Sequence, residues 1–482
     1  MNWAAFLGPS YSPDLAIDTQ LLENFVTQKV EGNQGKNPFC LKRTPGLVTF
    51  CDASADGVTG RVSLFGLDGH LFAVAGNRVM EVFFNGTYNL FAGTVAEDNR
   101  PAAMAGNPDQ LGIVVGGSGY VVENNALTQI ASAGFPANAR GLTAVASRFL
   151  TTRTNTQISQ PSELLDGTDW DASKAFAAEA MIDVIAAIGS ANNEYWAFGS
   201  QTIQVFDPTA DEDQLFVPRQ DVVLNYGIMA PDSLVNIGGS WYFIEGSSRG
   251  SGMVMRLAGY EMSRVSNHYI EEVIRQMTDP TDAVGWTYEE NGHMYYVLFF
   301  RDADMTLVYD VATDQWHNRS WRNPDTNERE AHRGYSAACV FNKILVGDRD
   351  NGLIYEMSMN YLDDDGDLIH RIRRTPCIDS ELDMITHSSF ELDGNKGIGL
   401  DGIDPDTDPY NPNLDPAGML RWSDNGGETW SSEYWRGFGR KGNFKRRVVW
   451  RRLGGARERV YEFSVSAAVD WLIVGCYINK RK

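Results

Sequence analysis

The stretch EYWAFGSQTIQVF, residues 194–206, places two short β-rich runs on either side of a turn that begins at Gly199. Runs of aromatic and β-branched residues that are separated by a tight turn predict a β-hairpin. The same cadence, an apolar run, a Gly, Asn or Asp turn and a second apolar run, returns about every 35 to 55 residues between about 60 and 360. Further copies are found at 71–82, 111–122, 241–257, 294–310 and 343–356, with a weaker one around 148–152.

These repeats predict six or seven small antiparallel sheets. One such sheet cannot bury both of its faces alone, but sheets stacked radially cover one another and protect their edges. We therefore predict an all-β protein in which residues 51–362 form a β-propeller of six or seven blades. A two-sheet sandwich is the alternative, and the repeats are too many for one sandwich. Only short helices are expected, such as Asn267 to Met277.

The two flanks of the repeats differ from them in composition. Residues 1–50 show little periodicity and end near the Pro45-Gly46 turn, which predicts an N-terminal arm or lead-in strand. Residues 363–482 combine Asp-rich loops with strands such as 461–465, where apolar and polar residues alternate. We expect a C-terminal antiparallel β domain in this region.

The composition restricts the class of protein. The chain has 482 residues, of which 43% are hydrophobic, and its five cysteines form no CxxC pair, so neither a disulfide framework nor a zinc site is expected. No apolar run reaches the ~20 residues of a membrane helix, and the start lacks the basic head of a signal peptide. The formal net charge of −22 argues against a surface that wraps DNA, because such a surface needs clustered Lys and Arg. We expect a soluble protein, made in a reducing cytoplasm.

The motifs of common enzymes are absent. We find no nucleophile elbow, Walker loop, HExxH or dinucleotide fingerprint in a usable context. The prolines in 400–416 favour an extended, solvated loop over a cation site built from Asp401, Asp404, Asp406, Asp408 and Asp415. The sequence thus predicts no catalytic residue, no metal and no cofactor.

Residues 423–430, SDNGGETW, fit the SxDxGxTW pattern called an Asp-box, best known from sialidases, where it is a structural hairpin. Its expected members are Ser423, Asp424, Gly427, Thr429 and Trp430. We expect the Ser and Asp side chains to bond the backbone of the turn, Gly to supply a positive φ, and Trp to pack beneath. The alternative function that this motif suggests is a carbohydrate-binding or glycoside-hydrolysing propeller.

A basic segment follows the Asp-box. Its candidate interface residues are Arg436, Arg440, Lys441, Lys445, Arg446, Arg447, Arg451 and Arg452, interleaved with Trp435, Phe444 and Trp450. Two interpretations remain open. The segment is either a docking surface for an acidic partner or phosphate, or a strand pair whose arginines cover apolar surface and pair with local carboxylates.

The C-terminal motifs resemble those of a known family. The runs LRWSDNGGETWS (420–431), Tyr434-Trp435 and RVVWRRLG (447–454) are similar to the packaged-DNA stabilisation proteins of short-tailed bacteriophages, which are tail hub or nozzle subunits. GKNP (35–38), RTPGL (43–47) and DGTDW (166–170) also resemble that family. The similarity covers roughly a quarter of the chain.

The resemblance implies a structural virion protein and not an enzyme. It implies a homo-oligomeric ring, expected to be a hexamer, that docks below the portal and adaptor rings, retains packaged DNA and forms the DNA exit channel. Tail fibres or spikes and a tail needle or plug would be neighbours, with double-stranded DNA passing through the lumen and no membrane insertion. The protein would be made in the bacterial host cytoplasm. Six copies would carry 6 × (−22) = −132 formal charges, so the wall would repel DNA and the basic segment would serve protein contacts.

Overall fold

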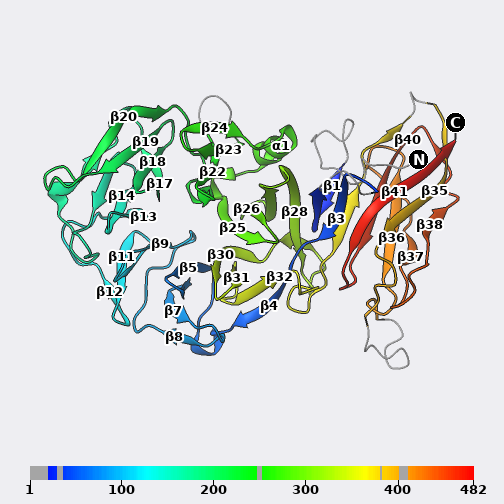
Figure 1. Ribbon diagram of the computed structural model, residues 1–482, viewed down its shortest axis with the longest axis horizontal. Coiled ribbons are helices and arrows are strands. Elements are labelled where there is room, and N and C mark those ends of the chain that lie inside the picture. Colours follow the sequence, from blue (N-terminus) through cyan, green and yellow to red (C-terminus); the bar gives the residue numbers. More distant parts are fainter. Residues whose placement is uncertain (1–19, 30–35, 247–251, 380–382, 401–410, 482) are drawn as a thin grey trace.

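In the computed structural model, the described residues are 20–29, 36–246, 252–379, 383–400 and 411–481. Within them, seven antiparallel blades of four strands each follow one another around a ring (Figure 1). Six of the blades are separate four-stranded sheets, and one is part of an eleven-stranded sheet. The six or seven expected blades are therefore seven. The blades are β5–β8 (Val62–Leu67, His70–Ala75, Arg78–Val82, Tyr88–Leu90), β9–β12 (Ala103–Gly106, Leu111–Val115, Ser118–Glu123, Ala126–Gln129), β13–β16 (Ala139–Val145, Arg148–Arg153, Ile158–Pro161, Phe176–Ala177), β17–β20 (Ile185–Ala191, Glu194–Gly199, Ile203–Pro208, Phe216–Leu224), β21–β24 (Val235–Ile237, Ser240–Glu245, Met253–Ala258, Glu261–Arg264), β25–β28 (Val284–Glu290, His293–Phe300, Met305–Asp310, Gln315–Arg322), and β30 (Gly334–Val340), β31 (Lys343–Asp348) and β32 (Ile354–Ser358) with β4 (Gly46–Cys51).

The sequence repeats coincide with the middle strands of the blades. The hairpin of 194–206 forms β18 and β19, and Tyr195, Trp196 and Phe198 are buried between neighbouring sheets. The weak repeat around 148–152 is β14 of the third blade. The expected short helix is α1 (His268–Gln276), which Asn267 caps by accepting a hydrogen bond from the Ile270 backbone amide.

The seventh blade takes its outer strand from the other end of the chain. β4 pairs antiparallel with β32, with Gly46 opposite Ser358 and Cys51 opposite Ile354. The innermost strand of this blade, β30, packs against β5 of the first blade, which completes the circle. Gly46 permits the closure because a Cβ there would lie 2.2 Å from the carbonyl oxygen of Asp363.

A β-sandwich lies beside the propeller (Figure 1). One sheet contains β1 (Leu21–Glu23), β33 (Arg371–Arg374), β40 (Glu458–Val465), β36 (Ala417–Ser423) and β37 (Tyr434–Gly437), with β34 (Ile378–Asp379) beside β40. The other contains β2 (Phe25–Lys29), β3 (Phe39–Arg43), β41 (Leu472–Arg481), β35 (Ile385–Gly394) and β38 (Val448–Arg451), with β39 (Gly455–Ala456) beside β35. Phe390, Trp450, Phe463 and Trp471 are buried in the core between them. Strands from 20–51 thus enter both bodies, while the domain limits at 50 and 362 stay a prediction.

β1 joins the sandwich to the propeller. It pairs with β33 on one side and with β28 of the sixth blade on the other, so one eleven-stranded sheet runs through both bodies. The buried Glu23 of β1 accepts a hydrogen bond from Ser320 Oγ at 2.6 Å and forms an ion pair with Arg329 Nε at 2.9 Å. The two bodies are therefore fastened by backbone pairing and by a buried carboxylate.

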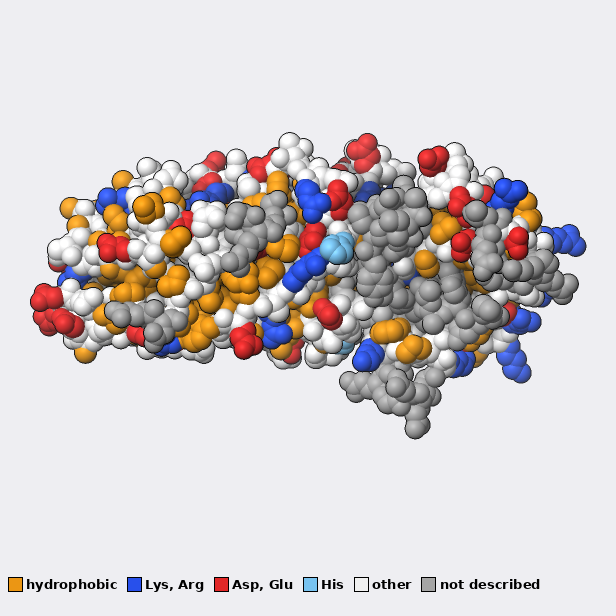
Figure 2. All heavy atoms as spheres, turned by 90° about the horizontal axis from the view of Figure 1, so that it is seen from above, with side chains coloured by type: hydrophobic (Ala, Val, Ile, Leu, Met, Phe, Trp, Pro, Cys, Tyr) orange, Lys and Arg blue, Asp and Glu red, His pale blue; other side chains and the backbone are white. Residues whose placement is uncertain are grey.

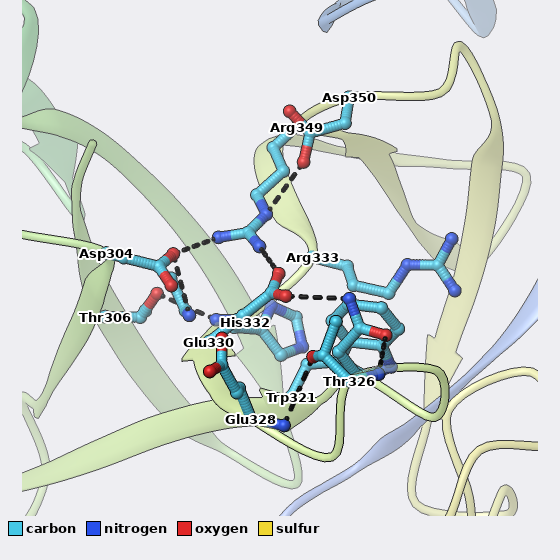
Figure 3. A network of polar contacts seen from close by, with 12 residues as sticks. Asp304, Thr306, Trp321, Thr326, Glu328, Glu330, His332, Arg333, Arg349 and Asp350 are labelled. Carbon is cyan, nitrogen blue, oxygen red and sulfur yellow. Dashed lines mark hydrogen bonds and ion pairs between the residues drawn. The ribbon is translucent and has the colours of Figure 1, made fainter. Parts of the chain in front are cut away.

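A short strand, β29 (Arg329–Ala331), connects this junction to the seventh blade. Arg349, at the end of β31, inserts its guanidinium between Glu330 of β29 and Asp304 of the sixth blade (Figure 3). The N–O distances are 2.5 Å to Glu330 and 2.6 Å to Asp304, and the Arg349 side chain is only 8% exposed. Two adjacent residues of β29 therefore bind different parts of the molecule. Arg329 pairs with Glu23 of β1, and Glu330 pairs with Arg349 of the seventh blade.

Asp364 lies buried in the segment that leads from the propeller to β33. Its Oδ1 atom has no hydrogen-bond partner within the described structure. Burial raises the pKa of this carboxyl to about 6, although Arg319, Arg371 and Arg333 oppose the shift. The pKa of Asp364 is thus higher in the folded state than the ~3.9 of an unfolded chain. Its contribution to the free energy of unfolding is therefore fully present below about pH 4, where the carboxyl is neutral, and is lost as the pH rises through 6.

We expect Asp364→Asn to stabilise the protein at pH 7 by up to about 3 kcal/mol, because the amide removes the cost of ionising a buried acid. The gain should vanish near pH 4. Urea unfolding at the two pH values measures it, with Asp68→Asn in an exposed hairpin as the control. A gain of equal size at both pH values would contradict the assignment.

Candidate protein interface

The Asp-box forms a tight turn between β36 and β37. Ser423 Oγ accepts hydrogen bonds from the backbone amides of Gly427 at 2.9 Å and Asn425 at 3.3 Å. Gly426 and Gly427 have φ values of +69° and +102°, a region that favours glycine. Asn425 Oδ1 accepts a hydrogen bond from the backbone amide of Thr429 at 2.9 Å, so the turn is held by side chains as expected for a structural hairpin.

One expectation for this turn was wrong. Asp424 does not bond the turn backbone, because its two oxygens accept hydrogen bonds from Arg459 Nε at 2.6 Å and Nη2 at 2.8 Å. The third position of the pattern is Asn425, and its amide oxygen takes the place of the Asp carboxylate. The Arg459 side chain is 2% exposed and lies over the ring of Trp422, 5.2 Å from its centroid.

Trp430 lies against a row of charges that the sequence did not reveal. Arg374, Glu462 and Arg421 stand side by side on β33, β40 and β36, because the strand register places both arginines opposite Glu462. Glu462 accepts hydrogen bonds from Arg374 Nη2 and Arg421 Nε, each at 2.7 Å. Both guanidinium groups lie within 5 Å of the Trp430 ring centroid, at 4.9 and 4.8 Å. The two arginines beside Glu462 thus hold Trp430, and with it the turn, against the sheet formed by β33, β40 and β36.

Three of the predicted interface residues are satisfied locally. Arg446 pairs with Asp415 at 3.4 Å, and Arg447 with Glu391 at 2.7 Å. Arg436 donates to the backbone carbonyl oxygens of Trp435 and Val449. Arg446 and Arg447 thus follow the interpretation of arginines that pair with local carboxylates, whereas Arg436 binds backbone carbonyl oxygens.

The other predicted residues are exposed. One of them is Lys441. Four others have no ion-pair partner among the described residues: Arg440, Lys445, Arg451 and Arg452. Three large aromatic side chains lie among them, with 44% of Tyr434, 53% of Trp435 and 70% of Phe444 exposed. Lys and Arg side chains project from this end of the molecule (right in Figure 2). We define the basic–aromatic surface as Tyr434, Trp435, Arg440, Phe444, Lys445, Arg451 and Arg452.

The remaining expectations concern metals, thiols and membranes. Asp401, Asp404, Asp406 and Asp408 lie outside the described residues, and no cluster of three His, Cys, Asp or Glu side chains that could hold a metal occurs within them. All five cysteines are free thiols. No helix among the described residues is long and apolar enough to cross a membrane.

Comparison with known proteins supplies the family. The model described as "Bacteriophage P22 Gp10, beta-propeller" matches residues 18–361, and that described as "Bacteriophage P22 Gp10, beta-sandwich" matches residues 370–481. The chain belongs to the bacteriophage P22 Gp10 family. The predicted propeller, C-terminal β domain and family resemblance are thereby confirmed, and the family is a structural one and not an enzyme family.

A curated relative is the tail hub protein gp10 of Salmonella phage P22. It is 24% identical over 326 residues, which are 64% of this chain and 68% of that protein. Among solved structures, the Pan2 WD40 domain of Neurospora crassa shares 10% identity with a TM-score of 0.41, over 65% of this chain and 94% of that one. The extracellular domain of BT4673 from B. thetaiotaomicron shares 11% identity with a TM-score of 0.45, over 89% and 59%. Both scores are below 0.5, so the fold assignment rests on the sheets and the family match.

We expect Asp424→Ala to lower the stability of the sandwich by about 3 kcal/mol, because it leaves the buried Arg459 guanidinium without its carboxylate. In the double variant Asp424→Ala with Arg459→Met the cost should be smaller, since an apolar side chain of similar length needs no counter-charge. Chemical unfolding of the full chain measures both variants. A double variant less stable than the single one would contradict the role of the pair.

Proposed function

We propose that this chain is a structural virion protein, the tail hub or nozzle subunit of a short-tailed bacteriophage. The observation that carries the proposal is the match of the Gp10 family to both the propeller and the sandwich, in that order, over nearly the whole chain. The relative in phage P22 bears the name tail hub protein. The chain would act in the virion tail after synthesis in the host cytoplasm.

In this proposal identical copies form a ring, a hexamer, below the portal and adaptor. The ring would retain packaged DNA until ejection and then provide its exit channel. Tail fibres or spikes and a needle or plug would be its neighbours.

The geometry of the propeller constrains the path of the DNA. Small residues such as Ala102, Gly141 and Ala187 line the centre of the propeller, and the hollow there measures about 250 Å³. Arg100, which follows the first blade, reaches across to Asp232, which precedes the fifth, and its Nε donates to Oδ2 at 2.8 Å. A duplex cannot pass through so small a hollow. The exit channel would therefore be the lumen between copies of the chain.

The charge distribution suits such a lumen. Residues 51–362 hold 39 Asp and Glu against 19 Lys and Arg, which is a net charge of −20 out of −22 for the chain. A wall made of propellers would repel the phosphate backbone and let DNA slide, because grip requires counterion release by clustered cations. Four exposed cations without an ion-pair partner among the described residues lie close together on the sandwich, where they are available for protein contacts: Arg440, Lys445, Arg451 and Arg452.

The decisive test removes the chain from the phage that encodes it. We expect heads assembled without this protein to fill and then lose their DNA, which nuclease sensitivity of the genome in purified particles measures. Supplying the purified chain to such heads should restore protection. Particles that keep their DNA and infect normally without the protein would refute the proposal.

We also expect the purified chain not to bind duplex DNA at physiological salt, because its net charge is −22. Fluorescence anisotropy of a labelled duplex, with a cationic DNA-binding protein as the positive control, measures this. Binding that weakens steeply with added salt would show a phosphate-gripping surface and contradict a repulsive wall.

A further inference from the structure

We propose that the basic–aromatic surface of one copy docks on the rim between the third and fourth blades of the next copy, head to tail around the ring. This inference rests on the proposed function, in that it assumes a ring of identical chains. A ring with rotational symmetry needs two different patches on each subunit that are complementary to each other. The question is therefore which second patch fits the basic–aromatic surface.

The molecule offers an acidic patch at its opposite end. The third and fourth blades lie at the end of the propeller away from the sandwich (Figure 1). The turn between β19 and β20 carries Asp211, Glu212 and Asp213, which are exposed and have no ion-pair partner within the described residues. Acidic side chains are also visible at this end of the space-filling view (left in Figure 2). One end of the chain thus carries four cations without an ion-pair partner, and the opposite end carries three such carboxylates. These two ends would meet when one copy is placed head to tail with the next.

A hollow with both apolar and polar walls lies beside the acidic turn. It measures about 780 Å³ and is lined by Phe176, Phe206 and Phe216, with Asp213 at its wall. Two cations, Lys174 and Arg219, also line the hollow. They should repel a basic partner only weakly, because each already forms an ion pair with a carboxylate. Lys174 pairs with Glu163 at 2.6 Å, and Arg219 binds Glu194 and Asp207, each at 2.5 Å.

The two patches match in chemistry. The basic–aromatic surface presents Trp435 and Phe444, 53% and 70% exposed, between its cations. Aromatic and arginine side chains carry much of the energy of protein interfaces when they enter a desolvated pocket. The hollow would receive an aromatic side chain while the acidic turn neutralises the arginines around it. Both patches lie on a sheet edge or turn, where long side chains can reach a neighbour.

Charge reversal on both patches tests the docking. The first variant of the full chain combines Arg440→Glu, Lys445→Glu, Arg451→Glu and Arg452→Glu. The second combines Asp211→Lys, Glu212→Lys and Asp213→Lys. We expect the wild-type chain to sediment as a ring, each variant alone to lose ring formation, and an equimolar mixture of the two to regain it. In the mixture every interface again joins opposite charges, and an even-numbered ring closes with the variants alternating.

The controls separate docking from misfolding. Arg153→Glu changes an exposed arginine on the third blade that makes no ion pair within the described residues, and it should leave ring formation intact. Trp435→Ala with Phe444→Ala should weaken association at every salt concentration, whereas the attraction between charges should weaken as salt is added. Circular dichroism of every variant should match that of the wild type, as the altered side chains are exposed.

Several outcomes would overturn the proposal. Variants that form rings as the wild type does would show that another surface makes the contact, and the tail-hub function would stand. Failure of the mixture to recover, with both variants folded, would show that the two patches are not partners. Binding of a labelled duplex that disappears only in the first variant would assign the surface to DNA phosphate instead. A wild-type chain that stays monomeric and does not join phage tails would refute both this inference and the proposed function.

Discussion

The pairing of β4 with β32 is the contact on which the rest of the structure depends. A propeller is a circle of sheets, and opening it at any point exposes the apolar faces of two neighbouring blades. Here the fastening strand, residues 46–51, comes from the N-terminal side, and its partner ends at Ser358. The same segment runs back through β3, β2 and β1 into the sandwich and the sixth blade. Residues 20–51 therefore contribute four strands to three sheets, so one segment of the chain both closes the propeller and attaches the sandwich.

The fold was predictable where the pairing is local. Each blade hairpin, such as Tyr195 to Phe206, carries its apolar pattern and turn residues within a dozen positions, so the sequence alone identifies it. The partners of β4 and β1 lie about 300 residues away, and register between such distant strands is set by packing and not by any local signal. For that reason the sequence suggested an arm for residues that the structure places in four paired strands.

The candidate interface shows the same difference between what local sequence reveals and what distant contacts decide. The segregation of cations in 436–452 was visible in the sequence, but the carboxylates that neutralise some of them come from other segments of the chain. Glu391 of β35 binds Arg447, and Asp415 binds Arg446, so only the three-dimensional structure separates satisfied from unsatisfied cations. The Asp-box pattern located the turn correctly, yet it could not show that Asp424 serves Arg459, because that arginine arrives with β40.

The junction bears on the ring that we propose, because it fixes the position of the sandwich relative to the propeller. A loose linker would let the sandwich move independently, whereas here β1 shares backbone hydrogen bonds with both bodies and Glu23 is buried between Ser320 and Arg329. Arg349 then ties the adjoining strand to the seventh blade. Such a junction keeps the two ends of the chain at a fixed distance and angle, and the proposed ring of head-to-tail contacts would require that constancy from every copy. The two patches that we propose to meet lie at opposite ends of this body, and their side chains are exposed, so they can act between copies without cost to the fold.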